Sequence, residues 1–187
     1  MKMRIISGIY KGRLINVPKS DLIRPTTDRV RETLFNLLNN ELNFDGITVL
    51  DIYAGSGSLG LECLSRGAKE IHFVEKNFPI YKNLVRNIES LEAKEKCFVH
   101  KVAANVFTKK PPKEKYDLIL ADPPFFKDDI YSVVESILIN NFLQTDSFII
   151  IERSIQTKGK DIRHFRTEPF KIIGDTCLYK IPGIQPQ

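Results

Sequence analysis

The stretch that decides the fold is residues 47–60, which read ITVLDIYAGSGSLG. Its first half, ITVLDIY (47–53), is apolar and rich in β-branched residues, which predicts a buried strand. Three glycines follow within six positions, as expected where a chain turns tightly from a strand into a helix. We expect that helix over residues 59–65. The stretch therefore predicts one strand–loop–helix unit of an α/β fold.

The alternation of strands and helices continues along the rest of the chain. A basic polar loop is expected after the fifth strand. The last two strands have no helical pattern between them, so we expect an antiparallel hairpin there. The rhythm predicts a mostly parallel α/β sheet with helices on both faces. Strands are expected at 70–75, 97–102, 116–121, 147–152, 169–173 and 177–181, and helices at about 28–42, 79–91 and 129–141.

The N-terminal segment differs from the body in charge. Residues 1–31 carry eight Lys or Arg and two acids, a net +6, and the remaining residues carry −1 of the chain's +5. Such a localised basic excess indicates a phosphate-backbone partner, although a solvated basic arm has the same composition. Residues 4–17 alternate loosely and predict a short hairpin. We therefore divide the chain into a basic extension (1–27) and a main domain (28–187).

Length and composition exclude several classes of protein. The 187 residues fit one compact domain, and no run of apolar residues is long enough to cross a membrane. The N-terminus lacks the apolar core of a signal peptide. The three cysteines show no metal-binding spacing, so we expect reduced thiols, no metal and a cytoplasmic location. No surplus apolar surface is evident, which favours a monomer.

The glycine loop predicts a nucleotide-like ligand. The glycines of DIYAGSGSLG (51–60) match the G-x-G-x-x-G fingerprint, and Glu75 ends the next expected strand, where an acid can accept hydrogen bonds from ribose hydroxyls. An NAD(P)-dependent oxidoreductase and an adenosyl-binding enzyme both fit this pattern. Asp51 favours the second, because its carboxylate repels a pyrophosphate and attracts the ammonium of an amino-acid moiety. S-adenosylmethionine supplies both the ribose and the ammonium.

A second motif follows the strand expected at 116–121, where residues 119–126 read ILADPPFF. Proline cannot donate to a sheet ladder, so the doublet ends strand pairing at Asp122 and stiffens the backbone there. Ligands of open α/β sheets lie outside the carboxyl ends of the strands, so we expect the glycine loop, Glu75 and Asp122 to converge. From these letters alone, an ordinary proline-terminated strand with an exposed acid explains the motif equally well.

These motifs in their order resemble the RsmD-type 16S ribosomal RNA guanine-N2 methyltransferases. The segments that carry the resemblance are RPTTDRVRETLFN (24–36), DIYAGSGSLGLECLSRGA (51–68), the acid of FVEKN (73–77) and DPPF (122–125). The resemblance implies a Rossmann-like S-adenosylmethionine-dependent methyltransferase with a mostly parallel seven-stranded sheet, a C-terminal antiparallel hairpin and a small N-terminal extension. It also implies methyl transfer from S-adenosylmethionine to the exocyclic N2 of one guanine in 16S ribosomal RNA of the small subunit.

The resemblance also implies roles for individual residues. Tyr53 stands where the family usually has Phe, and Val102 stands where it often has a polar residue for the adenine amine. Backbone groups around Ala103, or Asn105, are then expected to make that contact. The implied catalytic residues, which hold the target base, are Asp122, Pro123, Pro124 and Phe125. The implied cofactor-binding residues are Asp51, Tyr53, Gly55, Ser56, Gly57, Glu75 and Ala103.

The basic N-terminal segment supplies the candidate contacts to RNA phosphates. Arg29 and Arg31 can equally pair with Glu32 or remain solvated. Two further functions stay open: an adenine-N6 or protein glutamine methyltransferase, since the Asp122 tetrad suits any flat amine, and a non-catalytic RNA-binding module. The expected nucleic-acid-binding residues are Arg4, Arg13, Arg24, Thr26 and Arg29.

Overall fold

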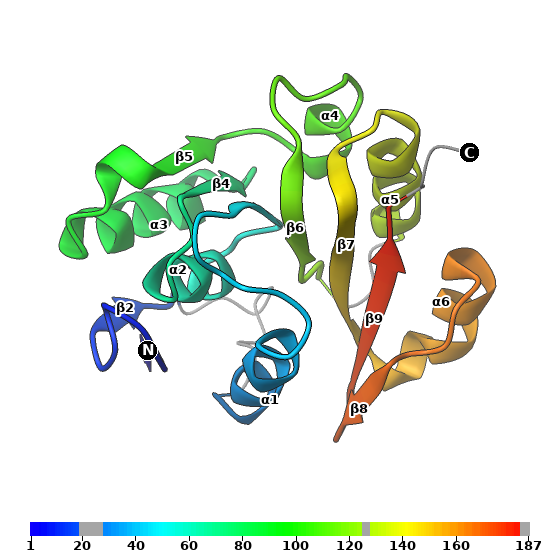
Figure 1. The fold of residues 1–187 in the computed structure, drawn as a ribbon, viewed down its shortest axis with the longest axis horizontal. Helices are drawn as coiled ribbons and strands as arrows, with labels where there is room; N and C mark the ends of the chain where they lie inside the picture. Colours follow the sequence, from blue (N-terminus) through cyan, green and yellow to red (C-terminus); the bar gives the residue numbers. More distant parts are fainter. Residues whose placement is uncertain (19–27, 125–127, 184–187) are drawn as a thin grey trace.

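A computed structural model describes residues 1–18, 28–124 and 128–183 of the chain. Its centre is a seven-stranded sheet in the order β5-β4-β3-β6-β7-β9-β8 (Figure 1). The first five strands of that order run parallel, and β9 runs antiparallel to both β7 and β8. The mostly parallel sheet and its C-terminal hairpin are therefore confirmed. The strands are β3 (Thr48–Ile52), β4 (Glu70–Val74), β5 (Cys97–His100), β6 (Tyr116–Ala121), β7 (Leu143–Ser154), β8 (Lys171–Ile173) and β9 (Thr176–Pro182).

Helices cover both faces of the sheet, as predicted (Figure 1). The first three helices pack on one apolar cluster and the last three on the other, because alternate residues of each strand point to opposite faces. The first group is α1 (Asp28–Leu38), α2 (Ser58–Ser65) and α3 (Phe78–Ser90). The second group is α4 (Ala104–Phe107), α5 (Asp129–Ile139) and α6 (Lys158–Phe165), with short 3₁₀ turns η1 (Lys94–Lys96) and η2 (Ile155–Thr157).

The predicted N-terminal hairpin is present. Strands β1 (Lys2–Arg4) and β2 (Leu14–Asn16) pair antiparallel, with Met3 opposite Ile15. Both of these residues are buried and belong to the apolar cluster that contains α1, α2 and α3. The hairpin therefore packs directly on the main domain. The domain boundary at residue 27 stays a prediction, since residues 19–27 lie outside the described part of the chain.

The largest departure from the expected elements is helix α6, which occupies the segment predicted to be a basic loop. Its sequence, KGKDIRHF, lacks a strong apolar stripe, so periodicity alone could not reveal it. The helix is held instead by buried Asp161, which accepts hydrogen bonds from Arg153 Nε (3.1 Å), Tyr131 Oη (2.7 Å) and Thr157 Oγ1 (2.6 Å). Tertiary hydrogen bonding here overrides weak local patterning.

Smaller differences concern element ends. Strand β7 extends beyond the expected 147–152 at both ends, and α1 ends at Leu38 rather than near residue 42. The short helix α4 follows β5, where no helix was expected. Cys63 and Cys177 are buried and all three cysteines are free. In the described part of the chain, no helix combines the length and the apolar character needed to cross a membrane.

The strand order creates a switch point between β3 and β6. From β3 the chain moves outward to β4 and β5, and then returns to place β6 on the other side of β3. The chain therefore leaves the carboxyl end of β3 toward β4 and the carboxyl end of β6 toward β7, in opposite directions along the sheet. In folds of this kind a crevice lies between two such connections. The glycine loop follows β3 and Asp122 follows β6, so both sequence motifs lie at this edge.

Candidate active site

The three glycines of the loop after β3 have different surroundings. A Cβ on Gly60 would lie 2.4 Å from Phe73 Cε1, so this glycine lets α2 pack closely on β4. A Cβ on Gly57 would lie 2.4 Å from Leu84 Cδ1, so this glycine lets the loop pack closely on α3. Gly55 has a φ of 56°, and a Cβ there would meet nothing closer than a backbone oxygen at 3.9 Å. The loop is therefore closely packed at Gly57 and Gly60 but open at Gly55, where a ligand can approach the backbone.

Asp51 lies beneath this loop and is only 2% exposed. Its Oδ2 accepts a hydrogen bond from the backbone N–H of Gly60 at 2.9 Å, which ties β3 to the first turn of α2. Burial raises the pKa of Asp51 well above its usual range, and the charges of Asp122 and Glu75 raise it further. Asp51 is thus a buried acid whose charged form is stabilised by one hydrogen bond and opposed by two neighbouring carboxylates.

Glu75 follows β4 directly and closes the other side of the loop. Its Oε2 accepts the N–H of Gly55 at 3.1 Å and its Oε1 accepts the N–H of Asn77 at 2.7 Å. Its own N–H donates to the His100 carbonyl at the end of β5 (3.1 Å). A carboxylate has about four acceptor sites, so this half-buried side chain keeps capacity for ribose hydroxyls.

The Asp-Pro-Pro motif follows β6, which ends at Ala121 as the proline doublet predicts. Asp122 is half-buried, Pro123 is buried and Pro124 is half-buried. Phe125, the fourth residue of the motif, lies outside the described residues. The charge of Asp122 adds to the raised pKa of Asp51, after the larger effect of burial.

Three predicted acids therefore converge at the switch point, from β3, β4 and β6. Burial is the main reason that the pKa of Asp51 is raised, and the charges of Asp122 and Glu75 both act in the same direction. Three carboxylates around one partly buried site produce a negative potential that favours a cation. This arrangement fits the positive charges of S-adenosylmethionine and disfavours the pyrophosphate of NAD(P).

Tyr53 and Ala103, two further expected cofactor contacts, lie beside this centre. Tyr53 has a φ of 67°, a rare conformation for a bulky residue, so the chain turns sharply as it leaves β3. Burial raises the pKa of its hydroxyl, as does the nearby carboxylate of Asp129. Ala103 is half-buried and precedes α4, and its carbonyl accepts the N–H of Phe107 at 2.9 Å. Half-buried Val102 packs against the apolar cluster instead.

Ser56, the remaining expected cofactor contact, reveals a residue that the sequence reasoning missed. Its carbonyl accepts a hydrogen bond from Asn87 Nδ2 at 2.9 Å. The same Asn87 side chain donates to the Asn16 carbonyl (2.9 Å) and accepts the Asn16 N–H (2.8 Å). This buried amide thus links the glycine loop to the N-terminal hairpin. A polar residue beside apolar Leu84 and Ile88 on α3 was its only sequence signal.

Glu62 of α2 is a second residue that the sequence reasoning missed. It is fully buried and accepts the backbone N–H groups of Ile6 (2.8 Å) and Ser7 (3.0 Å), as well as Arg66 Nε (2.9 Å). It therefore fastens the hairpin to the helix that follows the glycine loop. Its signal was an acid inside an otherwise buried helix, LGLECLS.

The candidate RNA-binding residues occupy different environments. Arg4, Arg13 and Arg29 are all exposed. Arg13 also donates a hydrogen bond to the Ser90 carbonyl at the end of α3. Arg31, which the sequence left ambiguous, is fully buried and bonds to Asp28 (2.9 Å) and to the Arg4 carbonyl, so it is structural. Arg24 and Thr26 lie outside the described residues.

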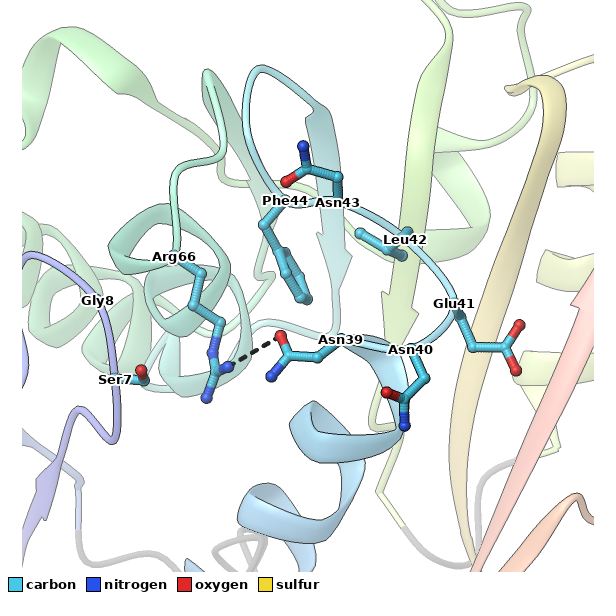
Figure 2. A pocket seen from close by; sticks show the side chains of 9 residues that line it. All are labelled: Ser7, Gly8, Asn39, Asn40, Glu41, Leu42, Asn43, Phe44 and Arg66. Carbon is cyan, nitrogen blue, oxygen red and sulfur yellow. Dashed lines mark hydrogen bonds between the residues drawn. The ribbon is translucent and has the colours of Figure 1, made fainter.

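The structure also contains a polar hollow of about 690 Å³ that the sequence did not predict. Figure 2 shows Arg66 at its wall, with Nη1 donating to Asn39 Oδ1 at 3.2 Å. Arg66 also bonds to Glu62 and lies 4.8 Å from the Phe35 ring centroid, so its charge is already paired. The hollow lies by the ends of α1 and α2, away from the three carboxylates. Its lining residues are Ser7, Gly8, Asn39, Asn40, Glu41, Leu42, Asn43, Phe44 and Arg66.

The sheet order, the helices on both faces and the antiparallel β7–β9 pair define a Rossmann-like methyltransferase fold. The chain belongs to the family described as Conserved hypothetical protein 95, whose model matches residues 3–181. It is 36% identical over 153 residues to "Ribosomal RNA small subunit methyltransferase D" of Haemophilus influenzae, which covers 81% of this chain and 78% of the relative. The resemblance to RsmD-type proteins is thereby confirmed.

Two further comparisons cover nearly the whole chain. "Putative rRNA methyltransferase YlbH" of Bacillus subtilis is 34% identical, over 97% of this chain and 100% of the relative. A solved structure described as "Putative methyltransferase yhhF from Escherichia coli" superimposes with a TM-score of 0.81 at 30% identity, and the match covers 98% of each chain. These relatives are named as methyltransferases, which decides between the two kinds of enzyme that the glycine fingerprint left open.

Proposed function

We propose that this protein transfers a methyl group from S-adenosylmethionine to the exocyclic N2 of a guanine in 16S ribosomal RNA. The observation that carries the proposal is the convergence of Asp51, Glu75 and Asp122 beside the open backbone at Gly55. Ribosomal RNA as the substrate class is supported by the names of relatives at 34–36% identity. Guanine N2 as the acceptor atom rests on the resemblance to the RsmD-type family.

The residues after β3 and β4 fit the cofactor. The open space at Gly55 admits a ligand against the backbone, and the spare acceptor sites of Glu75 suit two ribose hydroxyls. Asp51 lies at the methionine end, where an ionised carboxylate attracts the ammonium. Bound there, S-adenosylmethionine would supply a methyl group on a sulfonium sulfur, which leaves as a neutral thioether and needs no prior activation.

The residues after β6 act on the acceptor. A guanine amine is a weak nucleophile because its lone pair is delocalised into the ring. Asp122 accepts a hydrogen bond from this amine and the Pro123 carbonyl accepts the second, which turns the nitrogen toward the methyl group. Stacking on Phe125 holds the flipped base. Most of the rate then comes from alignment of nitrogen, methyl and sulfur, and Asp122 is placed to take the proton released after transfer.

The test is transfer of labelled methyl from S-adenosylmethionine to small ribosomal subunits from a strain that lacks this modification. Wild type and Asp122→Ala are compared, and the RNA is digested to nucleosides. We expect labelled N2-methylguanosine with wild type and at least a 100-fold lower rate with the variant. Asp128→Ala, which removes an exposed acid of the same segment, serves as the matched control and is expected to retain activity.

Each alternative function gives a different result. Labelled N6-methyladenosine would show that the site accepts adenine, and label in protein amides would show a glutamine methyltransferase. Cofactor binding with no transfer to RNA or protein, together with full RNA affinity of Asp122→Ala, would indicate a non-catalytic RNA-binding module. Any of these outcomes would replace guanine N2 as the proposed acceptor.

A further inference from the structure

A group of aromatic and basic side chains lies beside Glu75, on the side away from Asp122. Phe78, the first residue of α3, is 49% exposed, and its ring stacks on Tyr81 with an interplanar angle of 13° and a centroid distance of 6.4 Å. Two ammonium groups flank the same ring: Lys82 Nζ lies 4.6 Å and Lys101 Nζ lies 5.0 Å from its centroid. We call these four residues the Phe78 platform.

Burial does not explain the platform. An exposed phenylalanine stabilises the fold little, since its apolar surface stays in water. Both lysines are exposed, and within the described part of the chain neither one forms an ion pair with an acid. Lys82 comes from one turn along α3, and Lys101 comes from the segment after β5. Two elements thus bring unneutralised positive charge to one exposed aromatic ring.

The backbone fixes the platform next to the proposed cofactor site. Glu75 accepts a hydrogen bond from the N–H of Asn77, the residue before Phe78. Glu75 also donates its own N–H to the carbonyl of His100, the residue before Lys101. Both halves of the platform therefore adjoin residues that are bonded to Glu75. Strand β4 is two places from β6 in the sheet, about 10 Å at the usual strand spacing. The platform and Asp122 therefore both lie at the carboxyl ends of the parallel strands.

The chemistry of the platform fits a nucleotide of single-stranded RNA. Every base has a flat face that stacks on an aromatic ring, and each phosphate offers a negative charge to a nearby ammonium. A ring flanked by two cations supplies both contacts within one nucleotide length. Helix α3 also carries the Ser90 carbonyl that holds Arg13 of the hairpin, so the platform and the basic extension lie along one helix.

We propose that the Phe78 platform binds a nucleotide of the RNA substrate that flanks the target base, by stacking on Phe78 and by phosphate contacts to Lys82 and Lys101. The inference rests on the proposed function, because it assumes an RNA substrate. It extends the RNA-binding surface from the N-terminal segment to the far side of the cofactor site. The substrate strand then passes over the edge of the sheet between two anchored points.

The test measures two affinities for each variant: that for 16S ribosomal RNA lacking the modification and that for S-adenosylmethionine. We expect Phe78→Ala to raise the Kd for RNA about fivefold or more and to leave the Kd for S-adenosylmethionine unchanged. Phe78→Tyr retains a stacking ring and should restore RNA affinity. Phe98→Ala is the matched control, since Phe98 is a 43% exposed ring on β5 that contacts His72 rather than a lysine.

The lysines are tested through the salt dependence of binding. In the double variant Lys82→Gln, Lys101→Gln, the plot of the logarithm of the RNA association constant against the logarithm of the salt concentration should become less steep. Its negative slope should shrink in magnitude by about 1.4, or about 0.7 for each lost phosphate contact. The pair Lys109→Gln, Lys110→Gln removes two exposed lysines near α4 and should leave the slope unchanged. Thermal unfolding of each variant confirms that it is folded.

The outcomes separate this inference from the proposed function. If Phe78→Ala weakens binding of S-adenosylmethionine but not of RNA, the ring belongs to the cofactor site and the inference is wrong. If wild type methylates RNA and no platform variant changes RNA affinity or its salt slope, only the platform is disproved. If wild type neither binds nor methylates RNA, the proposed function and the platform fail together.

Discussion

Two buried carboxylates, Glu62 and Asp51, lie on consecutive elements but have opposite surroundings. Glu62 on α2 is surrounded by donors: two backbone N–H groups of the hairpin and the Arg66 guanidinium. Asp51 on β3 has one backbone donor and the charges of two other acids nearby. The first carboxylate is satisfied by the protein itself, whereas the second is placed to be satisfied by a cationic ligand. We propose that this difference separates an acid that supports the fold, Glu62, from an acid that binds the cofactor, Asp51.

The largest expected effect comes from removing the structural acid. Glu62→Ala leaves the N–H groups of Ile6 and Ser7 and the buried Arg66 without their acceptor, and loss of one partner of a buried ion pair costs about 3–5 kcal/mol. We expect urea denaturation to show a loss of that size. Glu89→Ala breaks the partly exposed pair with Lys94 and should cost less than about 1 kcal/mol. Equal losses in the two variants would contradict the role of Glu62.

A smaller loss of stability is expected at the amide that joins the hairpin to the glycine loop. Asn87→Leu removes the hydrogen bonds to Asn16 and takes from the buried Ser56 carbonyl the donor Asn87 Nδ2, at a cost of about 1–3 kcal/mol. Asn83→Leu is the matched control, because Asn83 makes one exposed hydrogen bond to the same Asn16 carbonyl (2.7 Å). The denaturant midpoints of the two variants are compared. Equal midpoints would contradict the role of Asn87 in joining the hairpin to the glycine loop.

Removing the charge of Asp51 is expected to change the free energy of unfolding in the opposite direction. Asp51→Asn keeps an oxygen that can accept the Gly60 N–H but removes a buried charge that faces two like charges. The free energy of unfolding should therefore stay the same or rise by up to about 1 kcal/mol at neutral pH. A clear loss of stability in thermal and urea unfolding would mean that the charge of Asp51 supports the fold, as that of Glu62 does.

The smallest effect is a pH dependence of stability. The pKa of Asp51 is raised in the folded protein, so the folded state binds more protons than the unfolded state at pH values between the two pKa values. Its contribution to stability is therefore greatest below the unfolded carboxyl pKa of about 3.9 and is lost as pH rises through the folded pKa. Asp51→Asn should remove this decline. Identical pH–stability curves for both proteins would contradict the assignment.

The sequence predicted those features that depend on local pattern. The βα rhythm, the closing hairpin, the end of β6 at the prolines and the position of the glycine loop all follow from periodicity and from the geometry of Gly and Pro. Helix α6, Asn87 and Glu62 escaped prediction because each makes at least one hydrogen bond to a residue 30 or more positions away in the chain. The sequence placed Asp51 beside the loop but could not show that Gly60 occupies one of its oxygens.

The most direct test of the central claim is calorimetric titration of S-adenosylmethionine into wild type, Asp51→Asn and Glu62→Gln. A hydrogen bond or ion pair to a charged group is worth about 1.5–3 kcal/mol, so Asp51→Asn should bind about 10- to 100-fold more weakly than wild type. Glu62→Gln should bind with nearly wild-type affinity once it is shown to be folded. Equal affinity of wild type and Asp51→Asn would contradict the claim that the three converging carboxylates form the site of a cationic cofactor.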